Sequence, residues 1–407
     1  MRSALLPIFL IVLVDVLALT IILPLLPFYA ERLGATPTVA GLLVSTFAAC
    51  QLLSGPVLGQ LSDRYGRKSM LVLSQIGTLI GFLLIARAES LAMVFAGRIL
   101  DGLTAGNLSL AQAYIADVTA PENRARAFGV IGIAFGIGFL IGPAISGYLA
   151  HYNYAWPLYA AAALSATSIV ATMTLLSNNP TPDPSTLGAD VKVSVPPPPG
   201  GQRVGILEWG KYRELFGRAT LKSLFARFFL FSMSFGMFTS GFGLFAERRF
   251  VNAAGHGWGP REVGFVFAYG GFLGIFLQGG IIGRLVKRYG EAPLVTAGLT
   301  CLGLGFVALG LSRAVPLLMV SATLSAFGNS ALRPALTSLV TRRVARHEQG
   351  LALGFVQSLT SLASIMAPAL GGFLIGHGWL STWGFVAAAA AFVGLLVADT
   401  APEAATP

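Results

Sequence analysis

Charged side chains are scarce in this sequence. They make up 11% of the 407 residues, whereas hydrophobic residues make up 55%. The charged share is about half that of an ordinary soluble domain. A water-soluble fold could not hide so much apolar surface, so the composition predicts an integral membrane protein.

Residues suited to metal or covalent chemistry are also few. The two cysteines, Cys50 and Cys301, lie in separate apolar runs, which argues against a structural disulfide or a cysteine metal site. The four histidines fall in loops or at the ends of apolar runs, and no two of them are spaced as a metal pair. The sequence also has no phosphate-binding glycine loop. These absences disfavour an enzyme, a metal or organic cofactor, and direct use of ATP.

Twelve apolar runs are long enough to cross a membrane. A hydrocarbon core of about 30 Å takes about 20 helical residues. The sequence therefore predicts an all-α integral membrane protein with twelve transmembrane helices. We expect these helices near residues 5–28, 38–61, 69–86, 91–115, 127–150, 155–176, 222–246, 262–283, 291–312, 315–339, 350–374 and 379–398.

Two motifs recur at nearly the same offset. Gly59–Lys68 has a degenerate copy at Gly283–Gly290, and Gly142–Leu149 has one at Ala367–Leu374. Internal repeats of this size are typical of transporters built from two related halves. The sequence therefore predicts two pseudo-symmetric six-helix halves, at residues 1–176 and 222–407.

Residues 177–221 form the one extended break in hydrophobicity. Pro196–Pro199, followed by two glycines, predicts a disordered or polyproline-like tether. Residues 204–218 mix apolar and charged side chains, which is typical of a short interfacial helix on the cytoplasmic leaflet. The alternative is a charged linker without fixed structure.

Basic residues are unevenly distributed between the two sides of the predicted bundle. With the N-terminus inside, the cytoplasmic segments hold eighteen Lys and Arg residues and the opposite side holds six. This bias predicts cytoplasmic termini. The formal charge of +10 then reflects topology and attraction to anionic lipid. A nucleic-acid partner is not expected, because the charge is dispersed among loops.

Three ionisable residues fall near the middle of predicted spans. Asp15 lies in the first span, and Arg98 and Asp101 lie one turn apart on the same face of the fourth. Each such group costs at least about 2.5 kcal/mol on insertion scales. Because all three lie at similar depth, we expect them to meet in one polar pocket that couples proton movement to transport.

The two carboxyl groups differ in their expected partners. Arg98 and Asp101 could simply neutralise each other as a structural pair. Asp15 has only Val, Leu and Ala as neighbours in its own helix, and desolvation favours the neutral form of a carboxyl group there. Asp15 is therefore the better candidate for a group that is loaded and unloaded with a proton.

The second half lacks equivalent charges. The repeat offset aligns Asp15, Arg98 and Asp101 with Ser240, Thr323 and Ala326, so coupling chemistry is expected in the first half. Arg333 could be a substrate contact or a gate charge. Aromatic residues of the second half could line a site for an apolar substrate, or could be lipid-facing or packing residues: Phe231, Phe235, Phe238 and Tyr269.

Glycines run through the fifth predicted span at near-helical spacing. Small residues let helices approach closely, and a proline bends the helix. The structural interpretation is tight helix packing, and the functional one is a seal that slides during alternating access. The residues concerned are Gly138, Gly142, Pro143 and Gly147.

These motifs resemble those of the major facilitator superfamily, and within it the bacterial drug/proton antiporters of the tetracycline-efflux type. Gly59–Lys68 looks like the loop signature of the superfamily, and Gly97-Arg98 with Gly102 is similar to its fourth-span motif. Gly138–Gly147 resembles the antiporter motif of the fifth span, and Ala113–Asp117 is similar to the tetracycline exporters in particular. Asp101 and Lys287 depart from the pattern expected of those exporters.

The resemblance implies roles for several of these residues. Arg98 would take part in proton transfer. A cytoplasmic charge cluster would latch the halves in an outward-open state, and its members would be Asp63, Arg64, Arg67 and Asp117.

The combined expectation is a proton-coupled antiporter that exports a small amphipathic compound. It would be a monomer in the bacterial inner membrane, driven by the proton gradient without a cofactor. The alternative is a facilitator or proton symporter for a metabolite such as a sugar or an organic anion, because arginines inside the membrane would suit an anionic substrate.

Overall fold

The computed structural model describes residues 5–119, 124–176, 217–344 and 348–397, and these residues are almost entirely helical. The predicted tether and interfacial helix lie mostly outside them. The first half contains α1 (Leu5–Ile22), α2 (Leu26–Arg32), α3 (Pro37–Tyr65), α4 (Arg67–Ala86), α5 (Leu91–Leu103), α6 (Asn107–Val118), α7 (Arg124–Tyr152) and α8 (Ala155–Leu175). The second half contains α10 (Ala219–Arg249), α11 (Pro260–Phe276), the π-helical η3 (Leu277–Ile281), α12 (Ile282–Tyr289), α13 (Glu291–Leu311), α14 (Val315–Arg342), α15 (Gln349–Gly376) and α16 (Leu380–Leu396).

The helices match the twelve predicted spans. Within the described residues, nine helices are long and apolar enough to cross a membrane, and α1 with α2 makes a tenth span bent by 42°. Pro24 lies in that break, where its missing N–H interrupts the helix. The broken pair α5 and α6 and the 17-residue α16 occupy the two remaining predicted runs.

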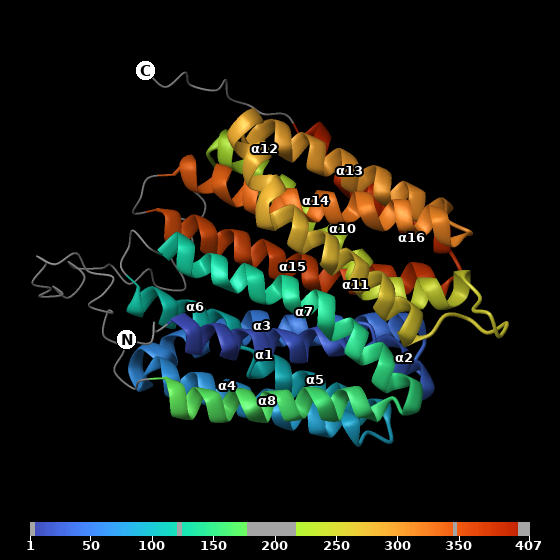
Figure 1. Cartoon of the computed structure of the whole chain (residues 1–407), viewed down its shortest axis with the longest axis horizontal. Helices are drawn as coiled ribbons and strands as arrows, with labels where there is room; N and C mark the ends of the chain where they lie inside the picture. Colours follow the sequence, from blue (N-terminus) through green and yellow to red (C-terminus); the bar gives the residue numbers. More distant parts are fainter. Residues whose placement is uncertain (1–4, 120–123, 177–216, 345–347, 398–407) are drawn as a thin grey trace, which may run out of the picture.

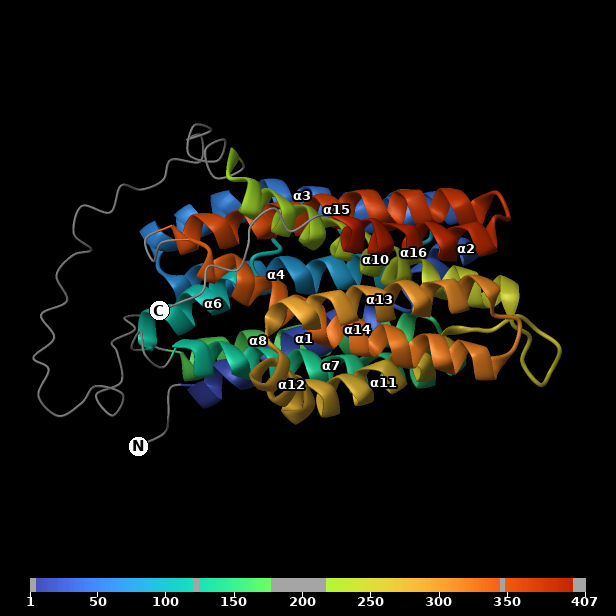
Figure 2. The same cartoon turned by 90° about the horizontal axis from the view of Figure 1, so that it is seen from above.

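The two halves pack side by side with their helices roughly parallel (Figure 1). Two helix pairs form most of the contact between them: α3 lies along α15, and α7 lies along α11 (Figure 2). Helix α8 ends and α10 begins at the same end of the bundle, which we call the linker end. The opposite end is the distal end.

The repeated loop motif has the same backbone geometry in both halves. Gly66 separates α3 from α4 with φ 91°, and Gly290 separates α12 from α13 with φ 82°. Positive φ is costly for residues with a side chain. Both motifs therefore have glycine at this equivalent position because the chain makes the same tight turn there.

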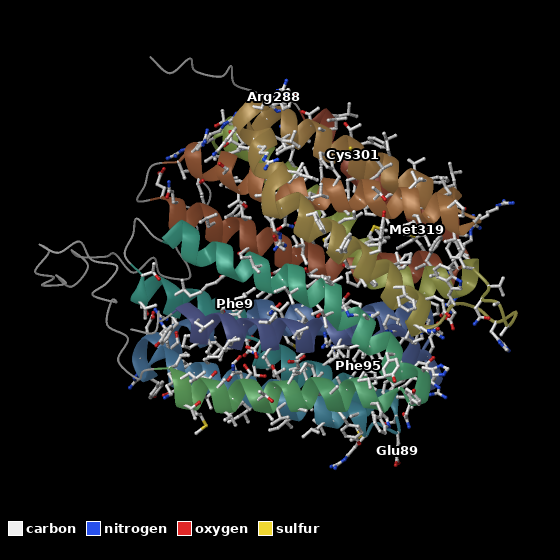
Figure 3. All side chains as sticks on the ribbon, viewed as in Figure 1. Phe9, Glu89, Phe95, Arg288, Cys301 and Met319 are labelled. Atoms are coloured by element: carbon white, nitrogen blue, oxygen red, sulfur yellow. The ribbon has the colours of Figure 1, made fainter. Side chains whose placement is uncertain are left out.

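Large apolar side chains cover much of the outer surface (Figure 3). Leu53 is 72% exposed and Leu396 is 80% exposed. Charged residues such as Glu89 and Arg288 lie toward the ends of the bundle, as the figure shows. Lipid contact explains this pattern, which would cause aggregation in a water-soluble protein.

Candidate functional site

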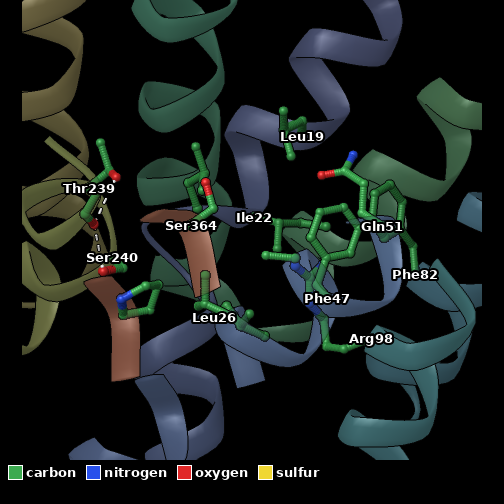
Figure 4. Close-up of a pocket in the computed structure, with 15 residues that line it drawn as sticks. Leu19, Ile22, Leu26, Phe47, Gln51, Phe82, Arg98, Thr239, Ser240 and Ser364 are labelled. Carbon is green, nitrogen blue, oxygen red and sulfur yellow. Dashed lines mark hydrogen bonds between the residues drawn. The ribbon is translucent and has the colours of Figure 1, made fainter. Parts of the chain in front are cut away.

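A pocket of about 190 Å³ lies between the two halves (Figure 4). Its walls are mainly apolar, and polar side chains enter from several helices. The first half contributes Leu19, Ile22, Leu23, Leu26, Val44, Phe47, Ala48, Gln51, Phe82 and Arg98, and the second contributes Gly236, Thr239, Ser240, Ser364 and Pro368. An apolar cavity with a few convergent polar groups is the usual form of a small-molecule site.

Arg98 is the only charged residue in that lining. Its guanidinium pairs with Asp101 at 3.0 Å and lies over the ring of Phe47, 4.1 Å from the centroid. Arg98 is 5% exposed and Asp101 is 4% exposed. The Nε atom of Arg98 has no hydrogen-bond partner in the described part of the chain. The Nε–H group of Arg98 can therefore still donate a hydrogen bond to a molecule in the pocket.

Asp15 is half-buried on α1 and is surrounded by neutral polar groups. Gln75 of α4 donates to its Oδ2 atom at 3.4 Å. The same amide nitrogen donates to Ser168 of α8 at 2.8 Å, and Ser168 also lies against the Asp15 carboxyl group. Asp15 therefore lies where three helices of the first half meet.

The prediction that Asp15, Arg98 and Asp101 share one pocket is wrong for this conformation. In the described residues no hydrogen bond or ion pair joins Asp15 to the other two. Instead, each carboxyl group contacts a different residue of α4. Gln75 faces Asp15, and Thr78, one turn further on, lies beside Asp101. The site thus consists of two carboxyl clusters linked through one helix.

None of the five predicted substrate residues lines the pocket. Phe231 is 1% exposed, and Phe238 packs against Phe267 and Phe306 at centroid distances of 5.7 and 5.6 Å. Phe235 continues the same row, with its ring centroid 6.3 Å from that of Phe231. These contacts match the packing alternative.

Two further predicted residues belong to the α11–α14 side of the second half. The hydroxyl of Tyr269 lies 2.9 Å from that of Thr323. Arg333 is exposed on α14, and its guanidinium makes no ion pair within the described ranges. Neither residue lines the pocket.

Sequence reasoning missed several pocket residues. Gln51, Thr239 and Ser364 are uncharged, so a search for charges inside the membrane passes over them. A polar amide in an apolar run was the available signal for Gln51. Ser240 was found only as the repeat partner of Asp15.

Three of the four residues of the predicted cytoplasmic charge cluster are joined by ion pairs, and all three belong to the first half. Arg67 pairs with Asp63 at 2.6 Å and with Asp117 at 3.0 Å, so it joins α3, α4 and α6. Arg64 does not join this cluster, because its guanidinium lies over the ring of its neighbour Tyr65. The cluster lies at the linker end.

The glycine motif of α7 faces two different partners. A Cβ atom on Gly138 would lie 2.6 Å from Val16, and one on Gly142 would collide with Thr20, so both face α1 next to Asp15. Thr20 also donates to the Gly138 carbonyl at 2.9 Å. A Cβ on Gly147 would lie 2.8 Å from Arg261 of α11. The glycine motif thus lets α7 pack closely against α1, which carries Asp15, and also against α11 of the second half.

The halves meet at the distal end through two pseudo-symmetric contacts. The Pro143 carbonyl of α7 closely approaches Gly264 of α11, and the Pro368 carbonyl of α15 approaches Gly41 of α3 in the same way. An ion pair at the same end joins Glu31 of α2 to Arg248 of α10 at 2.5 Å. These contacts fasten the two halves together at the distal end.

A side chain at Gly41 is expected to open the distal end. Because the Pro368 carbonyl occupies the space of its Cβ, Gly41→Val should destabilise this conformation by about 1–3 kcal/mol, as overpacking does in cores. In a protein without Cys50 and Cys301, Thr239→Cys places a single thiol in the pocket. An impermeant maleimide added on the distal side should label this thiol faster when Gly41→Val is also present.

Gly55 is the matched control for this experiment. It lies on the same helix, and its Cβ would meet nothing within 4 Å. Gly55→Val should therefore leave the labelling rate unchanged. Equal rates in the two variants would show that the close approach of α3 to α15 does not hold the distal end shut.

Comparison with known families fits this architecture. The model of the Major Facilitator Superfamily matches residues 8–290 and 250–407. The chain belongs to the Major Facilitator Superfamily. It is a multi-pass membrane transporter and not an enzyme.

The relatives of this superfamily member include drug-resistance proteins. The tetracycline resistance protein of class C from Escherichia coli is 30% identical over 363 residues, which cover 87% of this chain and 85% of the relative. Multidrug resistance protein 2 from Bacillus subtilis is 28% identical over 364 residues, with 88% and 85% covered. The transporter is thus related both to a tetracycline resistance protein and to a multidrug resistance protein.

Solved structures share the same fold. The human organic anion transporter MFSD10 (TETRAN) superposes with a TM-score of 0.69 at 22% identity, and the match covers 97% of this protein and 99% of that one. The nucleoside transporter NupG superposes with a TM-score of 0.77 at 15% identity, with 97% and 98% covered. At this identity the likeness establishes the fold alone.

Proposed function

We propose that this transporter is a proton-coupled antiporter that exports a small amphipathic compound. The observation that carries the proposal is the placement of Asp15. Among the described residues this carboxyl group has only neutral hydrogen-bond partners, so it can change its protonation state without breaking an ion pair. Relatives named for tetracycline and multidrug resistance support an exported drug-like substrate.

The pocket between the halves suits a molecule with apolar bulk and a few hydrogen-bonding groups. Leu19, Ile22 and Phe47 supply apolar surface, while Gln51 and Ser364 supply polar contacts. Arg98 connects this pocket with Asp101 behind it. A substrate that contacts Arg98 would therefore act on the Arg98–Asp101 pair, and Asp101 lies beside Thr78, one turn along α4 from the Gln75 that donates to Asp15.

We also propose how the protein lies in the membrane. Residues 1–176 and 222–407 form the two rocking halves, and residues 177–221 link them on the cytoplasmic side of a bacterial inner membrane. The charge cluster of Asp63, Arg67 and Asp117 lies at that linker end. The distal contacts then close the outer side, so this conformation presents the site to the cytoplasm.

Reconstituted vesicles test the proposal. With an inwardly acidic pH gradient and a panel that includes tetracycline, an antiporter should take a substrate into the vesicles as protons leave. One pH unit corresponds to 1.36 kcal/mol, so one proton per substrate supports about tenfold accumulation. Uptake that is unaffected by the gradient would contradict the proposal.

The alternative is a symporter or facilitator for a metabolite such as an organic anion. The Nε atom of Arg98 at the pocket wall favours this class, since it has no hydrogen-bond partner among the described residues and can still donate to an anion. The same vesicles separate the two functions. A symporter would drive substrate out together with protons under that gradient, and a facilitator would show no dependence on it.

Asp63→Asn is expected to slow transport and leave substrate affinity nearly unchanged. The side chain is 60% exposed and pairs with Arg67 at the linker end, far from the pocket lining. Exposed pairs contribute about 0–1 kcal/mol, so the fold should persist. Transport rate and binding affinity are measured on the same purified protein.

Arg64→Gln serves as the matched control for Asp63→Asn, because Arg64 makes no ion pair among the described residues and lies over Tyr65. It should transport at nearly the normal rate. Loss of binding in a folded Asp63→Asn protein would show that Asp63 acts on the site and not on the conformational equilibrium.

A further inference from the structure

The amide of Gln75 is a buried group that the proposed function does not use. Gln75 lies on α4 and is fully buried. Its Nε2 atom donates to both Asp15 and Ser168, whereas its Oε1 atom has no hydrogen-bond partner within the described ranges. A buried acceptor without a partner costs about 1–3 kcal/mol. Oε1 is therefore an unused acceptor that a half-turn of the amide would bring to the side of Asp15.

Ser168 allows the amide to turn. Its hydroxyl accepts from Gln75 and donates to the carbonyl of Ile11 at 3.5 Å. A hydroxyl group can either donate or accept. If the Gln75 amide turned by half a rotation, Oε1 would face Asp15 and Ser168, and the Ser168 hydroxyl could donate to it. Each setting leaves one end of the amide without a partner, so the two are comparable in energy.

The two settings fit the two protonation states of Asp15. An ionised carboxylate only accepts hydrogen bonds, whereas a protonated carboxyl group has an O–H that donates. Nε2 facing Asp15 suits the ionised form, and Oε1 facing Asp15 suits the protonated form. A fixed apolar side chain at this position would suit neither.

We propose that Gln75 is a positioning residue that turns its amide each time Asp15 gains or loses a proton. The proton comes from water and returns to water, and Gln75 itself neither gains nor loses one. The backbone of Gln75 stays in place, because its carbonyl accepts from Ser165 of α8 at 3.1 Å. The inference rests on the proposed function, in which Asp15 carries the proton.

No described charged group competes with Gln75 for Asp15. The described helices that pack most closely against α1 are α6, α7 and α8, and α4 reaches it through Gln75. The side chains of Arg124 and Arg126 on α7 lie outside the description. The other titratable or charged groups of these helices are Arg67 and Lys68 on α4, Tyr114 and Asp117 on α6, Tyr148, His151 and Tyr152 on α7, and Tyr159 on α8, and none of them is a described hydrogen-bond partner of Asp15.

Infrared difference spectra between two pH values test this inference without a substrate. In purified wild-type protein, protonation of Asp15 should produce a carboxyl C=O band that is absent in Asp15→Asn. The same pH step should lower the frequency of a glutamine amide carbonyl band, because Oε1 becomes an acceptor. Carbon-isotope labelling of glutamine identifies that band in the unmodified protein.

Gln75→Met removes the amide and keeps a similar volume. The glutamine band change should disappear, and the Asp15 carboxyl band should move to higher frequency because the acid has lost its acceptor. Thr78→Val is the matched control, since Thr78 lies one turn away beside Asp101. It should leave the Asp15 and glutamine bands unchanged.

The outcomes separate the two proposals. An Asp15 band without any glutamine change in the wild type, or with the same frequency in Gln75→Met, overturns the role of Gln75 and leaves Asp15 as the carrier. Absence of an Asp15 carboxyl band at every pH where the protein is folded overturns the carrier role and the role of Gln75 with it.

Discussion

Asp15→Asn is expected to abolish proton-driven accumulation and leave substrate exchange intact. Asparagine has the shape of aspartate but cannot release a proton, so the variant resembles a carrier that is permanently neutral. The roughly tenfold accumulation expected for a pH gradient of one unit should fall to none, since one unit corresponds to 1.36 kcal/mol. Accumulation is measured in vesicles with and without the gradient.

Exchange in the same vesicles provides the control. Counterflow of labelled against unlabelled substrate needs the pocket and the conformational change, but no net proton movement. It should therefore survive in Asp15→Asn. Glu89→Gln removes an exposed carboxyl group at the distal end and should leave both activities unchanged. Full accumulation in Asp15→Asn would exclude Asp15 as the proton carrier.

The membrane architecture was predictable because hydropathy depends on local sequence. Each span needs about 20 apolar residues whatever it packs against, so the runs could be found one at a time. The bend at Pro24 follows from the missing N–H of proline, which is also a local property. The turn glycines Gly66 and Gly290 could be matched because the motif repeats.

The arrangement of the site was only partly predictable. The Arg98–Asp101 pair follows from one-turn spacing on a single helix, and the structure forms it. The neighbours of Asp15 come from α4 and α8, so they depend on how three helices pack. Depth along the membrane normal therefore placed Asp15 and Asp101 at one level but could not show that they contact different residues of α4, Gln75 and Thr78.

The aromatic residues show a different limit of sequence reasoning. Phe231 and Phe238 are apolar whether they line a cavity or fill a core, and composition does not distinguish these cases. Here Phe238 contacts Phe242, Phe267 and Phe306. Polar residues in apolar runs, such as Gln51, mark the pocket better, because an apolar core would penalise an unpaired amide.

Removing Arg98 should change how substrate binding depends on pH. Arg98 favours the ionised form of Asp101 through their 3.0 Å pair, and its Nε atom has no described partner beside the pocket. Arg98→Ala leaves the Asp101 carboxylate buried without its cation. Breaking a buried pair in this way costs about 3–5 kcal/mol, unless Asp101 takes up a proton. Binding in Arg98→Ala should therefore lose the part of its pH dependence that comes from Asp101.

Arg98→Lys and Asp101→Asn distinguish coupling from simple charge balance. Lysine keeps the positive charge but has no planar fork with which to hold Asp101 and a substrate together, so coupling should weaken more than folding does. Asp101→Asn leaves Arg98 without its counter-charge and should tighten binding of anionic compounds. Substrate binding is measured in detergent over a range of pH for the wild type and each variant. Identical pH profiles in the wild type and Arg98→Ala would mean that Arg98 does not tune the proton site, and the pair would then be structural.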